Sequence, residues 1–137
     1  MKSEKQQTGG VTVARNKYGS RKVVRDGMTF DSVKEYNRWC ELKLLERASK
    51  ISFLERQFKF PLIPAQYDDN TLGARGGIKR GKLLEREVSY VADFKYYQDG
   101  KLVVEDVKGY KGGSAYAVFV LKRKLMLYIH GIRIKEV

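Results

Sequence analysis

Asp93 and Asp106 lie in two apolar segments that flank the dipeptide Asp99-Gly100. Asp-Gly between apolar runs is a strong signal for a two-residue type I′ turn and therefore for a β-hairpin. Counting outward from that turn brings Asp93 directly opposite Asp106, and Lys108 follows on the same face. Because like charges that face each other across two strands are destabilising, we expect a cation between the two carboxylates.

The spacing acid-x-Lys is not specific by itself, since the chain holds four copies of it. The copy that begins at Asp106 differs from the others because its strand faces a second aspartate. The apolar neighbours of both aspartates also favour central strands, where charge is costly. A hairpin edge with solvated charges and a bridging lysine is the alternative. A register shift of one residue would replace Asp106 with Glu105, which otherwise points to the opposite face.

The available ligands limit which cation can bind. The chain has one cysteine, Cys40, and one histidine, His130, which excludes an internal disulfide framework and a His/Cys zinc site. A metal must therefore be bound by oxygen, which favours Mg²⁺, Mn²⁺ or Ca²⁺. We interpret Cys40 as a buried, inert thiol and His130 as a favourable charge near a helix C-terminus.

The charge of the chain indicates its partner. The 137 residues include 28 Lys+Arg and 16 Asp+Glu, a net charge of +12, which attracts polyanions, with nucleic acid favoured over an anionic membrane surface. The apolar runs are too short to span a bilayer and the N-terminus lacks a signal-peptide core, so we expect an intracellular protein without a membrane partner. The cations expected to contact DNA phosphates are Arg21, Lys22, Arg75, Lys79, Arg80, Lys82, Lys122 and Lys124.

The composition along the chain predicts its organisation. Residues 1–22 are polar and basic and predict a flexible arm, and residues 23–137 predict a single domain. A glycine-rich stretch near 65–82 predicts a long mobile loop inside that domain. A short hairpin is expected around Asp26-Gly27.

Helices are predicted over residues 31–49 and 114–129. Ser32 and Glu35 fit a capping box at the start of the first helix, and Gly131 suits the position after the second. Strands are predicted over 51–64, over the two arms of the Asp99-Gly100 hairpin and over 132–137, with Pro61 and Pro64 ending the first strand. The first helix is expected to turn one stripe to the core, formed by Val33, Tyr36, Cys40, Leu44 and Ala48.

The resulting order, αβββαβ, with an aspartate on one central strand and Asp-x-Lys on the next, resembles the PD-(D/E)XK nuclease superfamily. The segments Phe30 to Glu35, Ala92 to Phe94 and Val104 to Gly109 are similar to those of small phage-encoded Holliday-junction-resolvase-like endonucleases. The resemblance covers roughly residues 16–137, and Ala92 stands where the superfamily has proline. It implies an α/β fold with a restriction-endonuclease-like core, a mixed central sheet flanked by helices.

The resemblance also implies roles for individual residues. Asp93, Asp106, Glu35 and the backbone carbonyl of Val107 would bind Mg²⁺, with Mn²⁺ as a substitute, and Lys108 would hold the attacking water. Such a set forms a catalytic group for phosphodiester hydrolysis. For Glu35, capping of its own helix is the alternative role.

The implied partner is branched DNA such as a four-way junction. Two symmetric cuts require a homodimer, and a phage-encoded enzyme of this type would work in the host cytoplasm. A less structure-selective phage DNA nuclease shares all of these residues. A non-catalytic nucleic-acid-binding module would explain the net charge equally well, but not the opposed aspartates.

Overall fold

The computed structural model describes residues 12–15 and 21–137, and the side chains of residues 22–137. The chain divides into two compact units, Met1–Leu54 and Glu55–Val137, and each is described by itself. The division falls inside strand β4 (Ser52–Ile63), which runs through it without a break. The single domain expected after residue 22 therefore stays a prediction.

The first unit begins with a three-stranded antiparallel sheet. Its strands are β1 (Thr12–Arg15), β2 (Arg21–Arg25) and β3 (Met28–Phe30), in the order β1-β2-β3. The Asp26-Gly27 turn joins β2 to β3, as predicted. Strand β1 lies within the segment predicted as a flexible arm and pairs with β2 along its whole length. The rest of the predicted arm, 1–11 and 16–20, lies outside the described residues.

Helix α1 (Val33–Arg47) packs against β2 and β3 within this unit. The Ser32 side chain accepts a hydrogen bond from the Glu35 N–H at 3.0 Å, and a Glu35 carboxylate oxygen accepts from the Asp31 N–H at 3.0 Å. These bonds confirm the predicted cap, because two N–H groups at the helix start gain partners.

The predicted core stripe of α1 is wrong. Val33 and Leu44 are 46% and 63% exposed, whereas Glu35 and Leu42 are buried. Tyr36, Cys40 and Leu44 instead line an open pocket of about 500 Å³, so Cys40 is half-buried rather than enclosed in a core. The remaining lining residues are Arg25, Asp26, Met28, Trp39, Lys43 and Arg47.

The second unit is built on a mixed four-stranded sheet. Its order is β11-β10-β9-β4, formed by β4, β9 (Val88–Gln98), β10 (Lys101–Asp106) and β11 (Lys135–Glu136). Strands β9 and β10 are antiparallel, and β10 and β11 are parallel. Pro61 was expected to end β4, but the strand continues past it to Ile63. The position is tolerated because β4 is an edge strand, where a missing N–H costs no ladder bond.

Helix α2 (Gly113–Leu125) follows β10 and continues as a π-helical turn, η1 (Met126–His130), which ends at Gly131 with φ +67°. The helix side chains Phe119 and Met126 pack on the sheet to form the core of this unit. His130 lies in the last turn, as predicted, and its Nε2 donates to the Pro61 carbonyl at 2.6 Å. The buried core residues are Phe60, Leu62, Tyr90, Ala92, Val104, Phe119, Met126 and Ile134.

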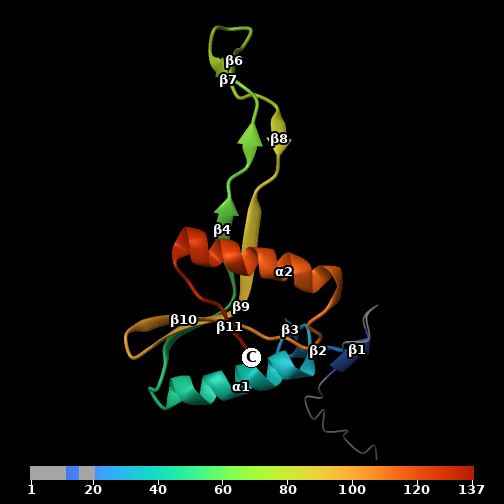
Figure 1. The fold of residues 1–137 in the computed structure, drawn as a ribbon, viewed down its shortest axis with the longest axis vertical. Helices are drawn as coiled ribbons and strands as arrows, with labels where there is room; N and C mark the ends of the chain where they lie inside the picture. The colour runs from blue at the N-terminus through green and yellow to red at the C-terminus, as the bar shows by residue number, and fades with distance from the viewer. Residues whose placement is uncertain (1–11, 16–20) are drawn as a thin grey trace, which may run out of the picture. The chain divides into compact units, whose positions relative to one another are not determined.

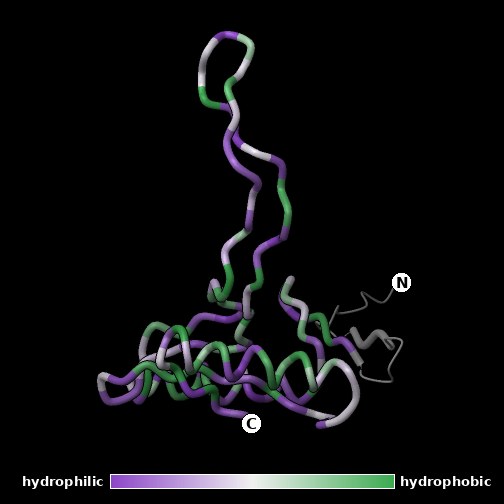
Figure 2. The backbone as a smooth tube through the Cα atoms, turned by 45° about the horizontal axis from the view of Figure 1, so that its top comes forward, coloured by the Kyte–Doolittle hydropathy of each residue, from purple (hydrophilic) through white to green (hydrophobic). Residues whose placement is uncertain are grey.

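Residues 66–85 form a narrow two-stranded extension between β4 and β9, here called the β-arm (Figure 1). Strand β5 (Gln66–Tyr67) pairs with β8 (Leu83–Glu85), and β6 (Thr71–Leu72) pairs with β7 (Ile78–Lys79). The sequence predicted a loop here, because strands of two or three residues are too short to give a periodic signal. Figure 2 shows that apolar and hydrophilic residues alternate along this extension.

The fold is therefore mixed α/β. Along the chain, the two helices and the four strands of the mixed sheet follow in the order α1-β4-β9-β10-α2-β11. This order matches the predicted helix, three strands, helix and strand. Within the described part of the chain, no helix combines the length and apolar character needed to cross a membrane.

Candidate active site

The hairpin of β9 and β10 has the predicted register. Gln98 pairs with Lys101 and, four steps along the ladder, Phe94 pairs with Glu105. The turn residues Asp99 and Gly100 have φ values of +51° and +72°, as a type I′ turn requires. Continued by one residue, this register sets Asp93 opposite Asp106.

The Asp93 carboxylate is held from two neighbouring strands. One oxygen, Oδ2, accepts a hydrogen bond from the Val107 N–H at 2.8 Å, directly after β10. The other, Oδ1, accepts from the Gln57 side-chain amide at 3.3 Å, on β4. Gln57 has φ +54°, a left-handed conformation that is uncommon for a residue with a side chain. Both oxygens of Asp93 are thereby oriented.

The Asp106 carboxylate is also held at both oxygens. Lys108 Nζ lies 2.7 Å from Oδ1, and the Tyr90 hydroxyl donates to Oδ2 at 2.6 Å. The Lys108 ammonium lies over the Phe119 ring, 3.4 Å from its centroid. Asp106 is only 6% exposed, so these contacts form with little water around them. Charge-assisted bonds of this kind are strong and fix the carboxylate in one orientation.

The backbone after β10 is fixed by the last residues of the chain. The Lys108 N–H donates to the Val137 carbonyl at 2.8 Å, and the Val137 N–H donates to the Asp106 carbonyl at 3.0 Å. These two bonds extend the parallel pairing of β10 with β11 and place Lys108 beside its aspartate.

The electrostatics of the pair show uncompensated negative charge. Burial, together with the nearby Asp106 charge, raises the pKa of Asp93 from 3.8 to about 6. The Val107 N–H, Gln57 and Lys108 oppose this shift without cancelling it. Burial also raises the pKa of Tyr90, and the Asp106 charge adds to the effect. Tyr90 therefore stays a hydrogen-bond donor, and one lysine does not neutralise two carboxylates.

Glu105 does not belong to this face. It pairs with Phe94 and is 0% exposed, and as the residue directly before Asp106 on β10 it points to the opposite face. The observed pairing excludes the one-residue register shift that would have placed Glu105 on this face instead of Asp106. Glu35 lies in the first unit, where it is 2% exposed and caps its helix. Its role as a metal ligand stays a prediction.

Sequence reasoning missed Tyr90, and for Gln57 it favoured a hydrogen bond at the edge of the core over a place in the site. Tyr90 is sixteen residues from Asp106 along the chain, and Gln57 is thirty-six from Asp93. No local pattern marks either contact. The only available signal was indirect. Two opposed carboxylates need hydrogen-bond donors, and a tyrosine and a glutamine lie on adjacent strands.

The donor set fits a hard divalent cation. Asp93, whose pKa is raised, and the neighbouring Asp106 carboxylate are the kind of oxygen ligands that Mg²⁺ takes, usually one or two per site. Among the side chains that the structure describes, no group of three or more Asp, Glu, His or Cys is arranged to hold a metal. Any further ligands would have to be water, backbone or substrate oxygens, which Mg²⁺ commonly retains.

The predicted phosphate-contacting cations differ in their surroundings. Lys122 is half-buried on α2, while its neighbour Arg123 pairs with Glu136 at 3.2 Å. Arg80 stacks on the Tyr67 ring at 3.6 Å. The side chain of Arg21 lies outside the described residues. The exposed members are Lys22, Arg75, Lys79, Arg80, Lys82 and Lys124.

The fold and site together define a mixed α/β protein with a buried aspartate, a half-buried aspartate and an adjacent lysine at the end of a central hairpin. A family described as "Protein of unknown function (DUF1064)" matches residues 15–133, and the chain belongs to this family. No curated protein and no solved structure matches the chain.

Proposed function

We propose that this protein is a Mg²⁺-dependent DNA endonuclease with a restriction-endonuclease-like core. The observation that carries the proposal is that the Asp93 carboxylate lies close enough to Asp106 for the Asp106 charge to raise its pKa, with Lys108 Nζ at 2.7 Å from the Asp106 carboxylate. A structural salt bridge would need one carboxylate for one lysine. The additional carboxylate of Asp93 is partly desolvated and raises the free-energy cost of the arrangement, which a bound cation would offset.

Asp93 and Asp106 would bind the metal, with the Val107 carbonyl as a further oxygen donor. A metal held there lowers the pKa of bound water and stabilises charge that develops on the phosphate oxygens. Lys108 would orient the attacking water and offset the charge of the scissile phosphate. Phe119 limits where its ammonium can move, since the ring lies directly beneath it.

Tyr90 and Gln57 position the pair without contacting the reacting atoms. Each donates to one carboxylate oxygen and leaves further lone pairs on both aspartates for a cation. Because Tyr90 is buried and its pKa is raised, it donates throughout the neutral pH range. The site is therefore preorganised before substrate binds.

The net charge of +12 supports a nucleic-acid substrate. Branched DNA and a homodimer rest on the sequence resemblance to resolvase-like endonucleases, and a less structure-selective nuclease is the alternative within the class. A non-catalytic binding module is disfavoured because two neighbouring carboxylates without a metal would repel phosphate.

The test uses a labelled four-way junction and a labelled linear duplex, each with Mg²⁺, Mn²⁺ or EDTA. We expect metal-dependent cleavage by the wild type and none by Asp106→Asn, with DNA binding retained or tightened in the variant. Asp99→Asn, in the exposed turn, is the matched control and should cleave normally. Absence of cleavage by the wild type with either metal, or full cleavage by Asp106→Asn, contradicts the proposal.

A further inference from the structure

The end of the β-arm carries two large apolar side chains that face solvent together. Leu72 on β6 pairs directly with Ile78 on β7, so both side chains leave the same face of the ribbon. They are 78% and 81% exposed. Single exposed apolar residues are ordinary, but a directly paired set at the end of an extension marks an interaction site.

Backbone hydrogen bonds and close backbone packing give the β-arm a defined conformation. The Asp68 N–H donates to the Lys82 carbonyl at 2.8 Å, and the Gly73 N–H donates to the Gly77 carbonyl at 2.7 Å. Gly81 packs so closely on the Asp68 backbone that a Cβ atom would lie 2.0 Å from its carbonyl oxygen. The apolar pair is therefore held in a fixed place by the backbone.

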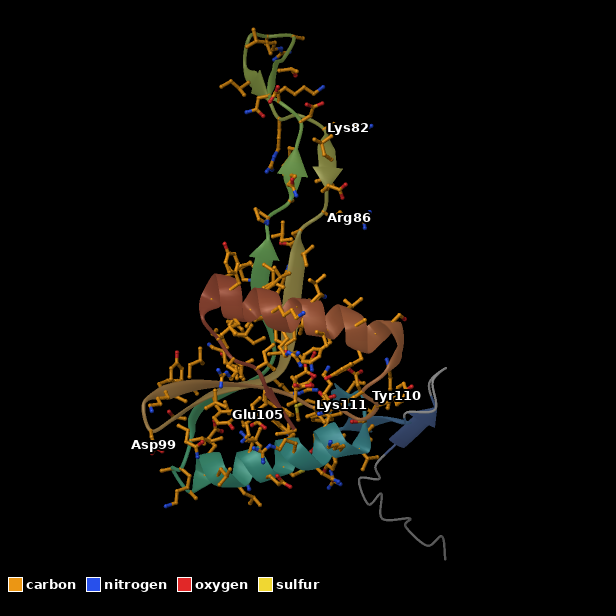
Figure 3. All side chains as sticks on the ribbon, in the orientation of Figure 1. Lys82, Arg86, Asp99, Glu105, Tyr110 and Lys111 are labelled. Carbon is orange, nitrogen blue, oxygen red and sulfur yellow. The ribbon has the colours of Figure 1, made fainter. Side chains whose placement is uncertain are left out.

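The charge around the pair points to a polyanion. Residues 70–82 contain four cations and no carboxylate: Arg75, Lys79, Arg80 and Lys82. Lys79 follows Ile78 directly and pairs with Thr71, on the opposite face of the ribbon. Lys82 and Arg86 project away from the extension (Figure 3). Apolar residues flanked by cations on a narrow ribbon are the combination that proteins use to unstack and kink DNA.

The β-arm is continuous with the strands of the candidate active site, because it connects β4, which carries Gln57, to β9, which carries Asp93. Fifteen residues separate Ile78 from Asp93, which at about 3.3 Å per residue is at most roughly 50 Å. B-DNA repeats every ~34 Å, so the end of the β-arm would meet a duplex within about one and a half turns of the cut.

We propose that Leu72 and Ile78 insert between adjacent base pairs of bound DNA, with Arg75 and Lys79 contacting the flanking phosphates. This inference rests on the proposed function for its substrate and adds a second contact that deforms the DNA. The unstacked step would favour branched or flexible DNA, where opening the stack costs less.

The experiment measures unstacking directly. Full-length Asp106→Asn protein is mixed with duplexes and junctions that carry 2-aminopurine at successive positions, and fluorescence is recorded at saturation. We expect a rise at a step within about one and a half turns of the cut site. The rise should be lost when Leu72→Ser and Ile78→Ser are combined. Leu84→Ser, at a 57% exposed position on β8, is the matched control and should keep the rise.

If Leu72 and Ile78 contact a membrane or a second copy of the chain instead of DNA, the experiments give different results. Persistence of the rise in the double variant overturns the inference. So does loss of binding to phosphatidylserine vesicles in that variant with no change in the DNA signal, which would assign the pair to a membrane. A change from dimer to monomer in sedimentation, again with no change in the DNA signal, would assign it to a second copy of the chain.

Failure of the inference is distinguishable from failure of the proposed function. Metal-dependent cleavage without any unstacking by wild-type protein contradicts only the insertion. Unstacking that depends on Leu72 and Ile78, without cleavage under any metal, supports the insertion and contradicts the nuclease.

Discussion

Replacing Asp93 with asparagine should stabilise the metal-free protein at neutral pH while it abolishes cleavage. The pKa of Asp93 lies at about 6 in the folded chain and at 3.8 without the fold, because burial and the charge of Asp106 disfavour its ionised form. The difference is 6 − 3.8, about 2 units, which corresponds to about 3 kcal/mol of destabilisation once Asp93 is ionised.

The direction of the pH dependence follows from this shift. An acid whose folded-state pKa is raised holds its proton more tightly in the folded chain, so its protonated form stabilises the fold below the unfolded-state value. That stability is lost as pH rises from 3.8 through about 6. Roughly half of the loss falls between about pH 5 and about pH 7.5.

The assay is urea denaturation in EDTA at about pH 5 and about pH 7.5 for wild type, Asp93→Asn and Asp99→Asn. The asparagine oxygen at position 93 still accepts from the Val107 N–H at 2.8 Å, so the substitution removes the charge and gives up only the longer bond from Gln57 at 3.3 Å. We expect Asp93→Asn to be more stable than wild type by about 2–3 kcal/mol at the higher pH and by less at the lower one. Asp99→Asn should follow the wild-type pH profile.

Parallel pH profiles for wild type and Asp93→Asn would refute the reasoning, because they would show that Asp93 ionises in the folded chain as it does in the unfolded one. A second arm adds Mg²⁺ at the higher pH. A ligand that binds only the folded state raises its stability, so Mg²⁺ should stabilise wild type and leave Asp93→Asn nearly unchanged.

Three further substitutions test the surrounding structure. Tyr90→Phe removes the donor to buried Asp106 and should cost about 1–3 kcal/mol of stability, measured by urea denaturation, and lower the cleavage rate. Gly81→Ala should open the β-arm to limited proteolysis, since the added carbon would meet backbone at 2.0 Å, whereas Gly77→Ala, with open space around it, should not. Ser32→Ala removes the α1 cap and should cost about 1 kcal/mol in thermal or urea unfolding; an unchanged midpoint would contradict the capping role.

The sequence predicted the parts of the fold that local chemistry decides. Asp99-Gly100 required a type I′ turn, and the turn determined the hairpin register that opposes the two aspartates. The Ser32 cap and the Gly131 terminus followed from unsatisfied backbone groups at helix ends. These features involve residues only a few positions apart, so a short window of sequence contains all the interacting atoms.

The buried face of helix α1 could not be predicted from a short window of sequence. The spacing of Val33, Tyr36, Cys40 and Leu44 indicated a core face, but the face that is buried runs through Glu35 and Leu42. Both stripes have a helical period, and what decides between them is the surface against which the helix packs. The short strands of the β-arm were missed for a related reason, because their pairing, and not their composition, defines them.

The sequence by itself determined that Asp93 and Asp106 face each other and that Lys108 lies on the same side. Only the tertiary structure decided how the pair is held, by Tyr90 on β9 and Gln57 on β4, with Phe119 of α2 beneath Lys108. The physical reason is that a turn is determined by the steric limits of two residues. A buried contact across the sheet depends instead on the packing of every side chain between the two elements.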